Sequence, residues 1–202
     1  MLFIAFKNVP FLAQFRATPN LLTLLRLFVV PFIVIEILDG DYRLAFILFL
    51  FAGITDALDG LLARWLSQKT TLGLYLDPIA DKLLLSTLFL VLTHVNLIPR
   101  YVTVLVFSRD LGIVLIATLL FATGALRDFR PSILGKANTL VQIIGLVTVL
   151  FERVCVVSGW AAAQWLAPVS AGVLRVIAVL APVSAAQYGW VILRRIDTPP
   201  AV

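Results

Sequence analysis

Charged residues are scarce in this 202-residue chain, in which Asp, Glu, Lys and Arg together make up 13% and hydrophobic residues make up 61%. Soluble domains average about 25% charged residues and roughly 45–50% apolar residues. A water-soluble surface cannot be built from so few polar side chains. The composition therefore excludes an ordinary soluble protein and predicts an integral membrane protein.

Cysteine and histidine are nearly absent, with Cys155 and His94 as the single copies. One cysteine excludes an internal disulfide, and no Cys/His set is present for a zinc site. Acidic residues are outnumbered, and the net charge is +5. The basic residues do not cluster in a soluble module, so they indicate contact with anionic headgroups or phosphate substrates and no nucleic-acid partner.

Long apolar runs, by contrast, fill the chain and are separated by charged or Pro/Gly-containing connections. Since a transmembrane helix needs about 20 apolar residues, they predict an all-α bundle of six transmembrane helices. The predicted spans are 20–38, 43–65, 78–98, 101–123, 137–157 and 170–193. One domain would cover 20–195, followed by a C-terminal tail at 196–202. Residues 1–19 are predicted to form an interfacial amphipathic segment rather than a cleaved signal peptide, because they lack a positive start and a cleavage site.

The distribution of Lys and Arg predicts the orientation, because cytoplasmic loops carry an excess of both. Nine fall on the side of the N-terminus and three on the other. The nine are Lys7, Arg16, Arg64, Lys69, Arg127, Arg130, Lys136, Arg194 and Arg195; the three are Arg43, Arg100 and Arg153. Both termini and the connection between the second and third spans are therefore predicted to be cytoplasmic, in a membrane of the bacterial inner or plasma type.

Four aspartates gather around that connection. Asp56 and Asp59 are three residues apart and share a helix face, and Asp77 and Asp81 are four apart on the next span. Asp77 precedes Pro78, which predicts Asp77 as the N-cap and Pro78 as the first residue of the third span. Because these spans are antiparallel neighbours, the four carboxylates are predicted to converge just inside the cytoplasmic interface.

Carboxylates at this depth need a counter-charge, and the nearby Arg64 and Lys82 supply too little. Oxygen ligands at helical spacing suit Mg²⁺, Mn²⁺ or Ca²⁺, and a pair of such ions would bind a diphosphate for phosphoryl transfer. Three other interpretations stay open from the residues alone: a structural salt-bridge network, a cation- or proton-coupled transporter, and an intramembrane polyprenyl-diphosphate transferase. The clustering of the acids at one membrane face is less typical of the transporter.

The spacing resembles a known family. Asp56-x-x-Asp59-Gly60-x-x-Ala63-Arg64, followed by Gly73-x-x-x-Asp77-x-x-x-Asp81, is similar to the signature of the CDP-alcohol phosphotransferases, which transfer a phosphatidyl group with release of CMP. The six-span plan extends this resemblance over nearly the whole chain. It implies CDP-diacylglycerol as donor, two divalent cations (Mg²⁺ or Mn²⁺) and a homodimer.

The resemblance also assigns roles to individual residues. It implies that Asp56, Asp59 and Asp77 bind the metals, and that Asp81 completes the site and acts as the general base on an acceptor hydroxyl. The residues that match CDP-diacylglycerol-binding positions of the family are Gly60, Ala63, Arg64, Thr70, Gly73, Asn20 and Thr23. Asn20 and Thr23 are also typical of a helix start, which leaves their role open.

A second basic cluster predicts the acceptor site. Arg109, in SRD at 108–110, is costly inside a span without a partner. Asp110 is adjacent in sequence and is expected to face elsewhere, so another acid or a phosphate is required. Arg130 and Lys136 flank the fifth span. These three are predicted to bind the acceptor phosphate, although Arg130 and Lys136 also fit ordinary cytoplasmic anchoring.

The same cluster resembles the glycerol-accepting branch of the family. LIP at 97–99, SRD and RPS-x-x-x-K-x-NT-x-x-Q are closer to the cardiolipin synthase pattern, whereas Gly135-Lys136 fits the phosphatidylglycerophosphate synthases. The resemblance therefore favours phosphatidylglycerol as the acceptor, with glycerol-3-phosphate as the alternative.

Overall fold

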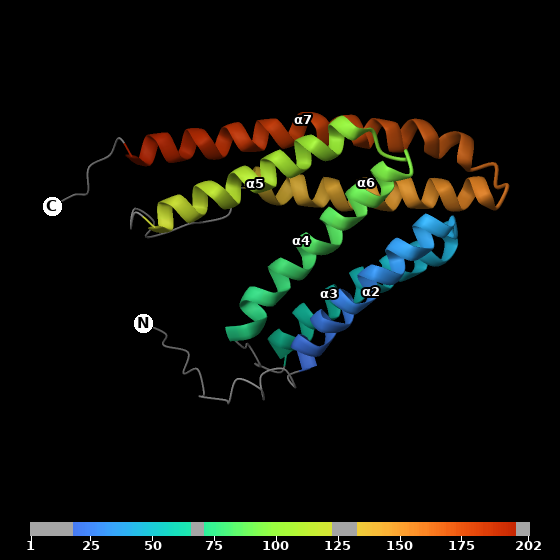
Figure 1. The fold of residues 1–202 in the computed structure, drawn as a ribbon, viewed down its shortest axis with the longest axis horizontal. Helices are drawn as coiled ribbons and strands as arrows, with labels where there is room; N and C mark the ends of the chain where they lie inside the picture. Colours follow the sequence, from blue (N-terminus) through green and yellow to red (C-terminus); the bar gives the residue numbers. More distant parts are fainter. Residues whose placement is uncertain (1–17, 66–70, 123–132, 197–202) are drawn as a thin grey trace. The chain divides into compact units, whose positions relative to one another are not determined.

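The computed structural model describes residues 18–65, 71–122 and 133–196, and these ranges form six α-helices without a strand (Figure 1). The all-α prediction is confirmed. The predicted interfacial segment and the C-terminal tail fall almost entirely outside the described residues. The described helices group into two compact units, residues 1–91 and 92–202, which are considered separately below.

The first unit is built on an antiparallel pair of helices, α2 (Thr18–Asp39) and α3 (Tyr42–Trp65), which lie side by side in Figure 1. Gly40 ends α2 with a positive φ of 81°, a conformation that glycine adopts without a steric penalty. Asp41 then caps α3, because its Oδ1 accepts a hydrogen bond from the Leu44 amide at 3.1 Å. The turn between the two helices is therefore only two residues long.

The third helix of this unit, α4 (Thr71–His94), corrects one prediction. The helix begins seven residues before Pro78, so Asp77 is not its N-cap and Pro78 is not its first residue. A proline inside a helix loses one backbone hydrogen bond, but long apolar helices tolerate it when neighbouring groups compensate. Pro31 in α2 lies inside its helix in the same way. Residues 71–77, which include Gly73 and were predicted to belong to the connection between the second and third spans, lie in α4, and residues 66–70 lie outside the described part of the chain.

The second unit contains α5 (Arg100–Ala122), α6 (Ile133–Val157) and α7 (Ala163–Ile196), and α7 packs against both other helices. The end of α4 is joined to α5 by a hydrogen bond of 2.5 Å between the Thr93 and Thr103 hydroxyls. Gly159, at φ 66°, ends α6, and the Trp160 amide donates to the Cys155 carbonyl at 2.9 Å. Helix α7 begins seven residues earlier than predicted.

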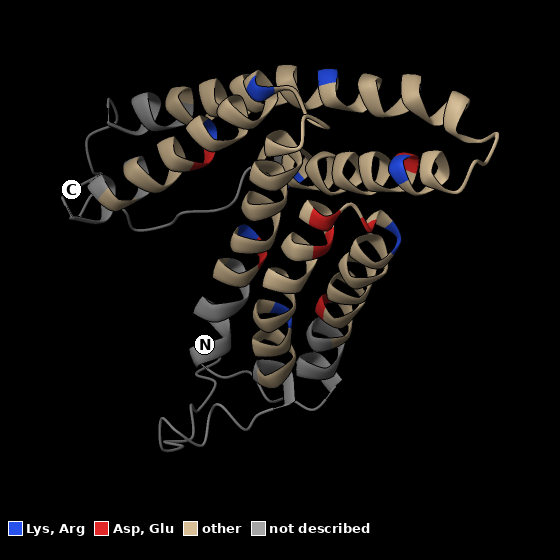
Figure 2. Cartoon of the chain, turned by 45° about the vertical axis from the view of Figure 1, so that its right-hand side comes forward, with Lys and Arg blue, Asp and Glu red and all other residues tan. Residues whose placement is uncertain are grey.

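Three of the described helices are long and apolar enough to cross a bilayer, namely Leu21–Asp39, Leu134–Val157 and Ala163–Trp190. Figure 2 shows how sparse the charged residues are along the described helices. These helices are typical of a membrane protein. Helix α3 carries Asp56, and α5 carries Arg109 and Asp110, so polar groups interrupt two of the helices outside this set.

Gly145 of α6 lies in close contact with α7. A Cβ atom placed there would lie 2.6 Å from the Ile177 Cδ1 and 3.5 Å from the Val173 Cγ1. Overpacking a well-packed contact typically costs about 1–3 kcal/mol. We therefore expect Gly145→Val to lower the free energy of unfolding by this amount in an SDS titration followed by circular dichroism.

Gly172→Val is the matched control for this prediction. Gly172 is also helical, but a Cβ atom there would meet nothing within 4 Å. The two variants change helix propensity alike, so the difference between them isolates the contact. Equal losses of stability in both variants would contradict the assignment of Gly145 as the close-approach point.

Candidate functional site

Three helices of the first unit meet at one arginine that the sequence analysis did not consider. Arg26 of α2 has a fully buried side chain, and its Nη2 lies 2.7 Å from Asp56 Oδ1 on α3. Its Nη1 donates a hydrogen bond to Asp81 Oδ1 on α4. One guanidinium thus brings together two of the four predicted site aspartates, from two different helices.

The short turn explains why Arg26 and Asp56 meet. Arg26 lies 13 residues before the end of α2 at Asp39, and Asp56 lies 14 residues after the start of α3 at Tyr42. At 1.5 Å per residue these positions are about 20 Å and 21 Å from the turn. The two side chains therefore reach the same level of the antiparallel pair.

The arginine neutralises only part of the charge. Two carboxylates and one guanidinium leave a charge of −1 (−2 + 1), and Asp59 and Asp77 would add two negative charges. Asp56 and Asp81 each remain 45% exposed, so part of each carboxylate is open on the side that Arg26 does not cover. Exposed, partly compensated carboxylates are oxygen donors of the kind that Mg²⁺ and Mn²⁺ prefer.

Asp59 and Asp77 are placed through the helix backbone only. Both lie inside continuous helices, one turn from Asp56 and Asp81 respectively, and their side chains are outside the described part. The side chains that the structure does describe include no group of three metal-binding residues. The donor set available to a divalent cation therefore depends on whether Asp59 and Asp77 join Asp56 and Asp81.

A sequence signal for Arg26 existed. It is the single charged residue in the apolar run LLTLLRLFVVPFIVI at 21–35, where an unpaired charge would be expensive. Such a residue requires an acidic partner at the same depth. Thr23, three residues earlier and also fully buried, shares the inward face of α2 with Arg26.

Most of the predicted nucleotide-binding residues are placed only by their helices. Gly60, Ala63 and Arg64 lie in the last turns of α3, Asn20 lies at the start of α2, and their side chains are not described. Thr70 lies outside the described residues. Thr23 is the one member whose surroundings are known, and it is buried beside the arginine–aspartate cluster.

In the second unit, the structure corrects the expectation that Asp110 faces away from Arg109. Its Nη1 lies 2.6 Å from Asp110 Oδ1, and its Nε donates to the Ser184 Oγ at 3.1 Å. Adjacent helical residues point about 100° apart, but the long arginine side chain spans that angle. A phosphate is therefore not required to compensate this buried charge.

The other predicted acceptor residues lie at the start of α6. Lys136 is exposed in its first turns, and Arg130 is outside the described residues. Further along α6, the amide groups of Asn138 and Gln142 are almost fully buried. Asn138 Nδ2 and Oδ1 and Gln142 Nε2 lack a hydrogen-bond partner among the described residues. Buried amides normally find partners, so this face of α6 is suited to a polar ligand.

Comparison with known proteins agrees with the aspartate spacing. The family model for CDP-alcohol phosphatidyltransferases matches residues 16–190. The chain is 38% identical over 144 residues to a cardiolipin synthase (CMP-forming) of Rattus norvegicus. This match covers 62% of the present chain and 47% of the relative. The chain is also 32% identical over 150 residues to the CDP-diacylglycerol–glycerol-3-phosphate 3-phosphatidyltransferase of Bacillus subtilis. That match covers 67% of the present chain and 77% of the relative.

A probable phosphatidylglycerophosphate synthase of Mycobacterium tuberculosis is 35% identical over 140 residues, covering 66% of each chain. The match to the cardiolipin synthases of animals spans only about half of those relatives' length. The match to the family model covers most of the present chain, including all four aspartates and Arg26. The protein belongs to the CDP-alcohol phosphatidyltransferase family.

Proposed function

We propose that the protein is a metal-dependent phosphatidyltransferase, which moves the phosphatidyl group of CDP-diacylglycerol to a glycerol hydroxyl and releases CMP. The convergence of Asp56 and Asp81 on Arg26 carries this proposal. Arg26 brings together two carboxylates of the family signature from separate helices, and part of each carboxylate side chain remains exposed. Family membership favours this reaction over an ion-coupled transporter or a polyprenyl-diphosphate transferase.

The chemistry proposed for the site is a direct displacement at phosphorus. Asp81 takes the proton from the acceptor hydroxyl, whose oxygen attacks the phosphatidyl phosphorus. The bond from that phosphorus to the bridging oxygen of the diphosphate breaks, and CMP leaves with the electron pair. No covalent enzyme intermediate is needed. Arg26 positions Asp81 through their hydrogen bond.

Divalent cations complete this proposal. Asp56, Asp59, Asp77 and Asp81 would hold two Mg²⁺ or Mn²⁺ ions, which when bound neutralise the negative charge on the diphosphate. The partial exposure of Asp56 and Asp81 supports this assignment, because a cation can reach carboxylate oxygens that are not fully buried.

Binding of the donor and of the acceptor is assigned to separate residue sets. We propose that the cytidine diphosphate part of CDP-diacylglycerol is bound by Gly60, Ala63, Arg64, Thr70, Gly73, Asn20 and Thr23. The acceptor phosphate is assigned to Lys136, Arg130 and Arg109, with the charge of Arg109 shared with Asp110. The buried amides of Asn138 and Gln142 are further candidates for binding the acceptor headgroup.

Phosphatidylglycerol is the preferred acceptor in this proposal, so that the product is cardiolipin. The SRD and K-x-NT-x-x-Q segments and the similarity to named cardiolipin synthases support it. Glycerol-3-phosphate is the alternative, supported by the similarity to named glycerol-3-phosphate 3-phosphatidyltransferases. Both acceptors offer a primary hydroxyl and a phosphate.

The membrane arrangement is part of the same proposal. All six helices would span the bilayer, with an interfacial segment at 1–19 and with both termini and the aspartates on the cytoplasmic side. The excess of Lys and Arg on that side supports this orientation. A homodimer is proposed from the family resemblance.

The deciding experiment offers the purified protein CDP-diacylglycerol and Mg²⁺ with one acceptor at a time. We expect CMP release with phosphatidylglycerol and a lipid product whose mass equals the acceptor plus one phosphatidyl group. Release without an acceptor should stay at background, because the displacement needs an attacking hydroxyl. EDTA in place of Mg²⁺ should also reduce release to background.

Glycerol-3-phosphate serves as the parallel acceptor in the same assay. A product of phosphatidylglycerophosphate mass, formed only with this acceptor, would select the alternative. Failure of both glycerol acceptors to release CMP would overturn the proposed reaction, and full turnover in EDTA would overturn the metal assignment.

A further inference from the structure

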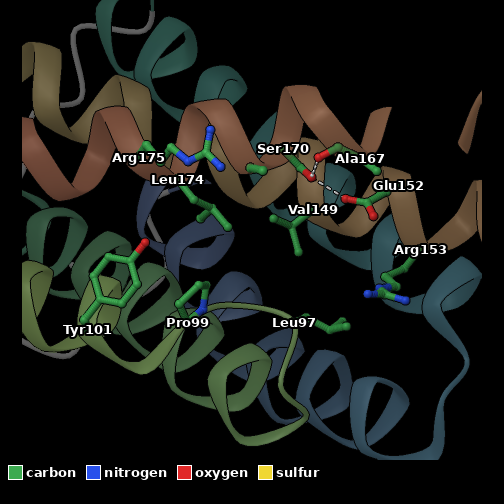
Figure 3. A pocket seen from close by; sticks show the side chains of 11 residues that line it. Leu97, Pro99, Tyr101, Val149, Glu152, Arg153, Ala167, Ser170, Leu174 and Arg175 are labelled. Atoms are coloured by element: carbon green, nitrogen blue, oxygen red, sulfur yellow. Dashed lines mark hydrogen bonds between the residues drawn. The ribbon is translucent and has the colours of Figure 1, made fainter. Parts of the chain in front are cut away.

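A polar pocket lies in the second unit, between the start of α5, the end of α6 and the first half of α7 (Figure 3). Its volume is about 300 Å³. Leu97, Val149 and Leu174 line it with apolar side chains, whereas Arg153 and Arg175 approach it from two sides. No role in the transfer reaction uses this pocket.

The two arginines of the pocket have no partner in the part of the chain that the structure describes. Neither Arg153 nor Arg175 makes an ion pair or a hydrogen bond there. The one acid of the pocket, Glu152, accepts a hydrogen bond from the Ser170 hydroxyl. Two guanidinium groups and one carboxylate leave the pocket with a charge of +1 (+2 − 1) at pH 7. The pocket therefore favours an anion.

Three residues of the pocket, Ser170, Leu174 and Arg175, lie on α7 within Ala163–Trp190, a stretch that is long and apolar enough to cross a bilayer. Lipid is the solvent around such a helix in a membrane. A pocket on this helix is therefore accessible to lipid molecules.

We propose that this pocket binds the phosphodiester of an anionic phospholipid, with Arg153 and Arg175 contacting the phosphate oxygens. The apolar lining of Leu97, Val149 and Leu174 would contact the glycerol and the first acyl carbons. Arginine is suited to this role because its planar group pairs with phosphate oxygens through two parallel hydrogen bonds. Lipid phosphate is favoured over free phosphate because the pocket is partly apolar and lies on a helix that is apolar enough to cross a bilayer.

The pocket is separate from the aspartate cluster along the chain. Leu97 follows the C-terminal end of α4, whereas Asp81 lies 13 residues before that end at His94, or about 20 Å of helix. The inference therefore goes beyond the proposed function, because it assigns a second lipid site to residues that the proposed reaction does not use.

Native mass spectrometry with dioleoyl phosphatidylmethanol tests this proposal. This lipid is anionic but has no headgroup hydroxyl, so it cannot serve as an acceptor in the proposed reaction. We expect the Arg153→Gln/Arg175→Gln double variant to retain the lipid roughly 10- to 30-fold more weakly than the unmodified protein, because each surface arginine contributes about fivefold. Arg43→Gln, an exposed arginine outside the pocket, should retain it normally.

A second variant keeps both charges and fills the space. Ala167 lines the pocket and is exposed, so Ala167→Trp should displace the lipid while leaving both arginines in place. CMP release by the pocket variants should match that of the unmodified protein, which separates this proposal from the proposed function. Failure of that function would remove CMP release in every protein and leave lipid retention intact.

Three results would overturn the assignment. Equal retention by the double variant and the unmodified protein would remove the role of the arginines. Equal retention of dioleoyl phosphatidylcholine would remove the preference for an anionic lipid. Displacement of the lipid by inorganic phosphate at millimolar concentration would identify a site for free phosphate instead.

Discussion

Asp81→Asn is expected to lower the rate of CMP release from CDP-diacylglycerol by about 10²- to 10⁴-fold, the usual contribution of a general base. The asparagine keeps the shape of the side chain but cannot accept the proton of the acceptor hydroxyl. The loss should persist at saturating Mg²⁺. The measurement is the initial rate of CMP release at several Mg²⁺ concentrations.

Two other aspartates provide the comparison. Asp56→Asn also loses a contact with Arg26, but Asp56 has no proton-transfer role in the proposal, so excess Mg²⁺ should restore part of its activity. Asp39→Asn, at the exposed end of α2, should have normal activity. Recovery of Asp81→Asn at high Mg²⁺ would assign Asp81 to metal binding alone and remove it as the base.

Arg26→Met is expected to destabilise the protein by about 3 kcal/mol. Removing one member of a buried ion pair typically costs about 3–5 kcal/mol, and the lower end applies because Asp56 and Asp81 are each 45% exposed. Methionine retains much of the length of the arginine side chain, so the loss reports mainly the charge. The measurement is the free energy of unfolding from an SDS titration.

Two comparisons isolate the ion pairs from general effects of the substitution. Arg43→Met changes an exposed arginine of α3 and should lose less than about 0.5 kcal/mol. Adding Asp56→Asn to Arg26→Met should cost less than Asp56→Asn alone, because the two residues interact directly. Additive losses in this double-mutant cycle would contradict the pairing of Arg26 with Asp56.

The sequence was sufficient to predict the helices but not all of their ends. Long apolar runs identified six helices, whereas Pro78 was a misleading start signal because the apolar residues before it continue the helix. A start rule based on Asp-Pro describes an exposed helix end. In a long apolar helix the cost of interrupting the backbone hydrogen bonds outweighs the local preference of proline.

Side-chain partners were harder to predict than helices. The spacing of Asp56 and Asp81 indicated convergence, but the third helix at that point was identified only through Arg26. Arg109 shows the converse error, because a rule that adjacent residues point apart neglects the length of the arginine side chain. Such contacts depend on how the helices pack and on which conformations the side chains adopt. The sequence pattern carries no information on either.

The two-residue turn at Gly40 and Asp41 has a consequence for the evolution of this chain. A shift of one residue in the register of α3 against α2 would turn Asp56 by about 100° around the helix axis, and would carry it away from Arg26 without altering either residue. Loop length usually varies freely among related proteins, but here the length of the turn determines the register of α3 against α2. Length variation at this turn should therefore be selected against as strongly as substitution of the aspartate itself.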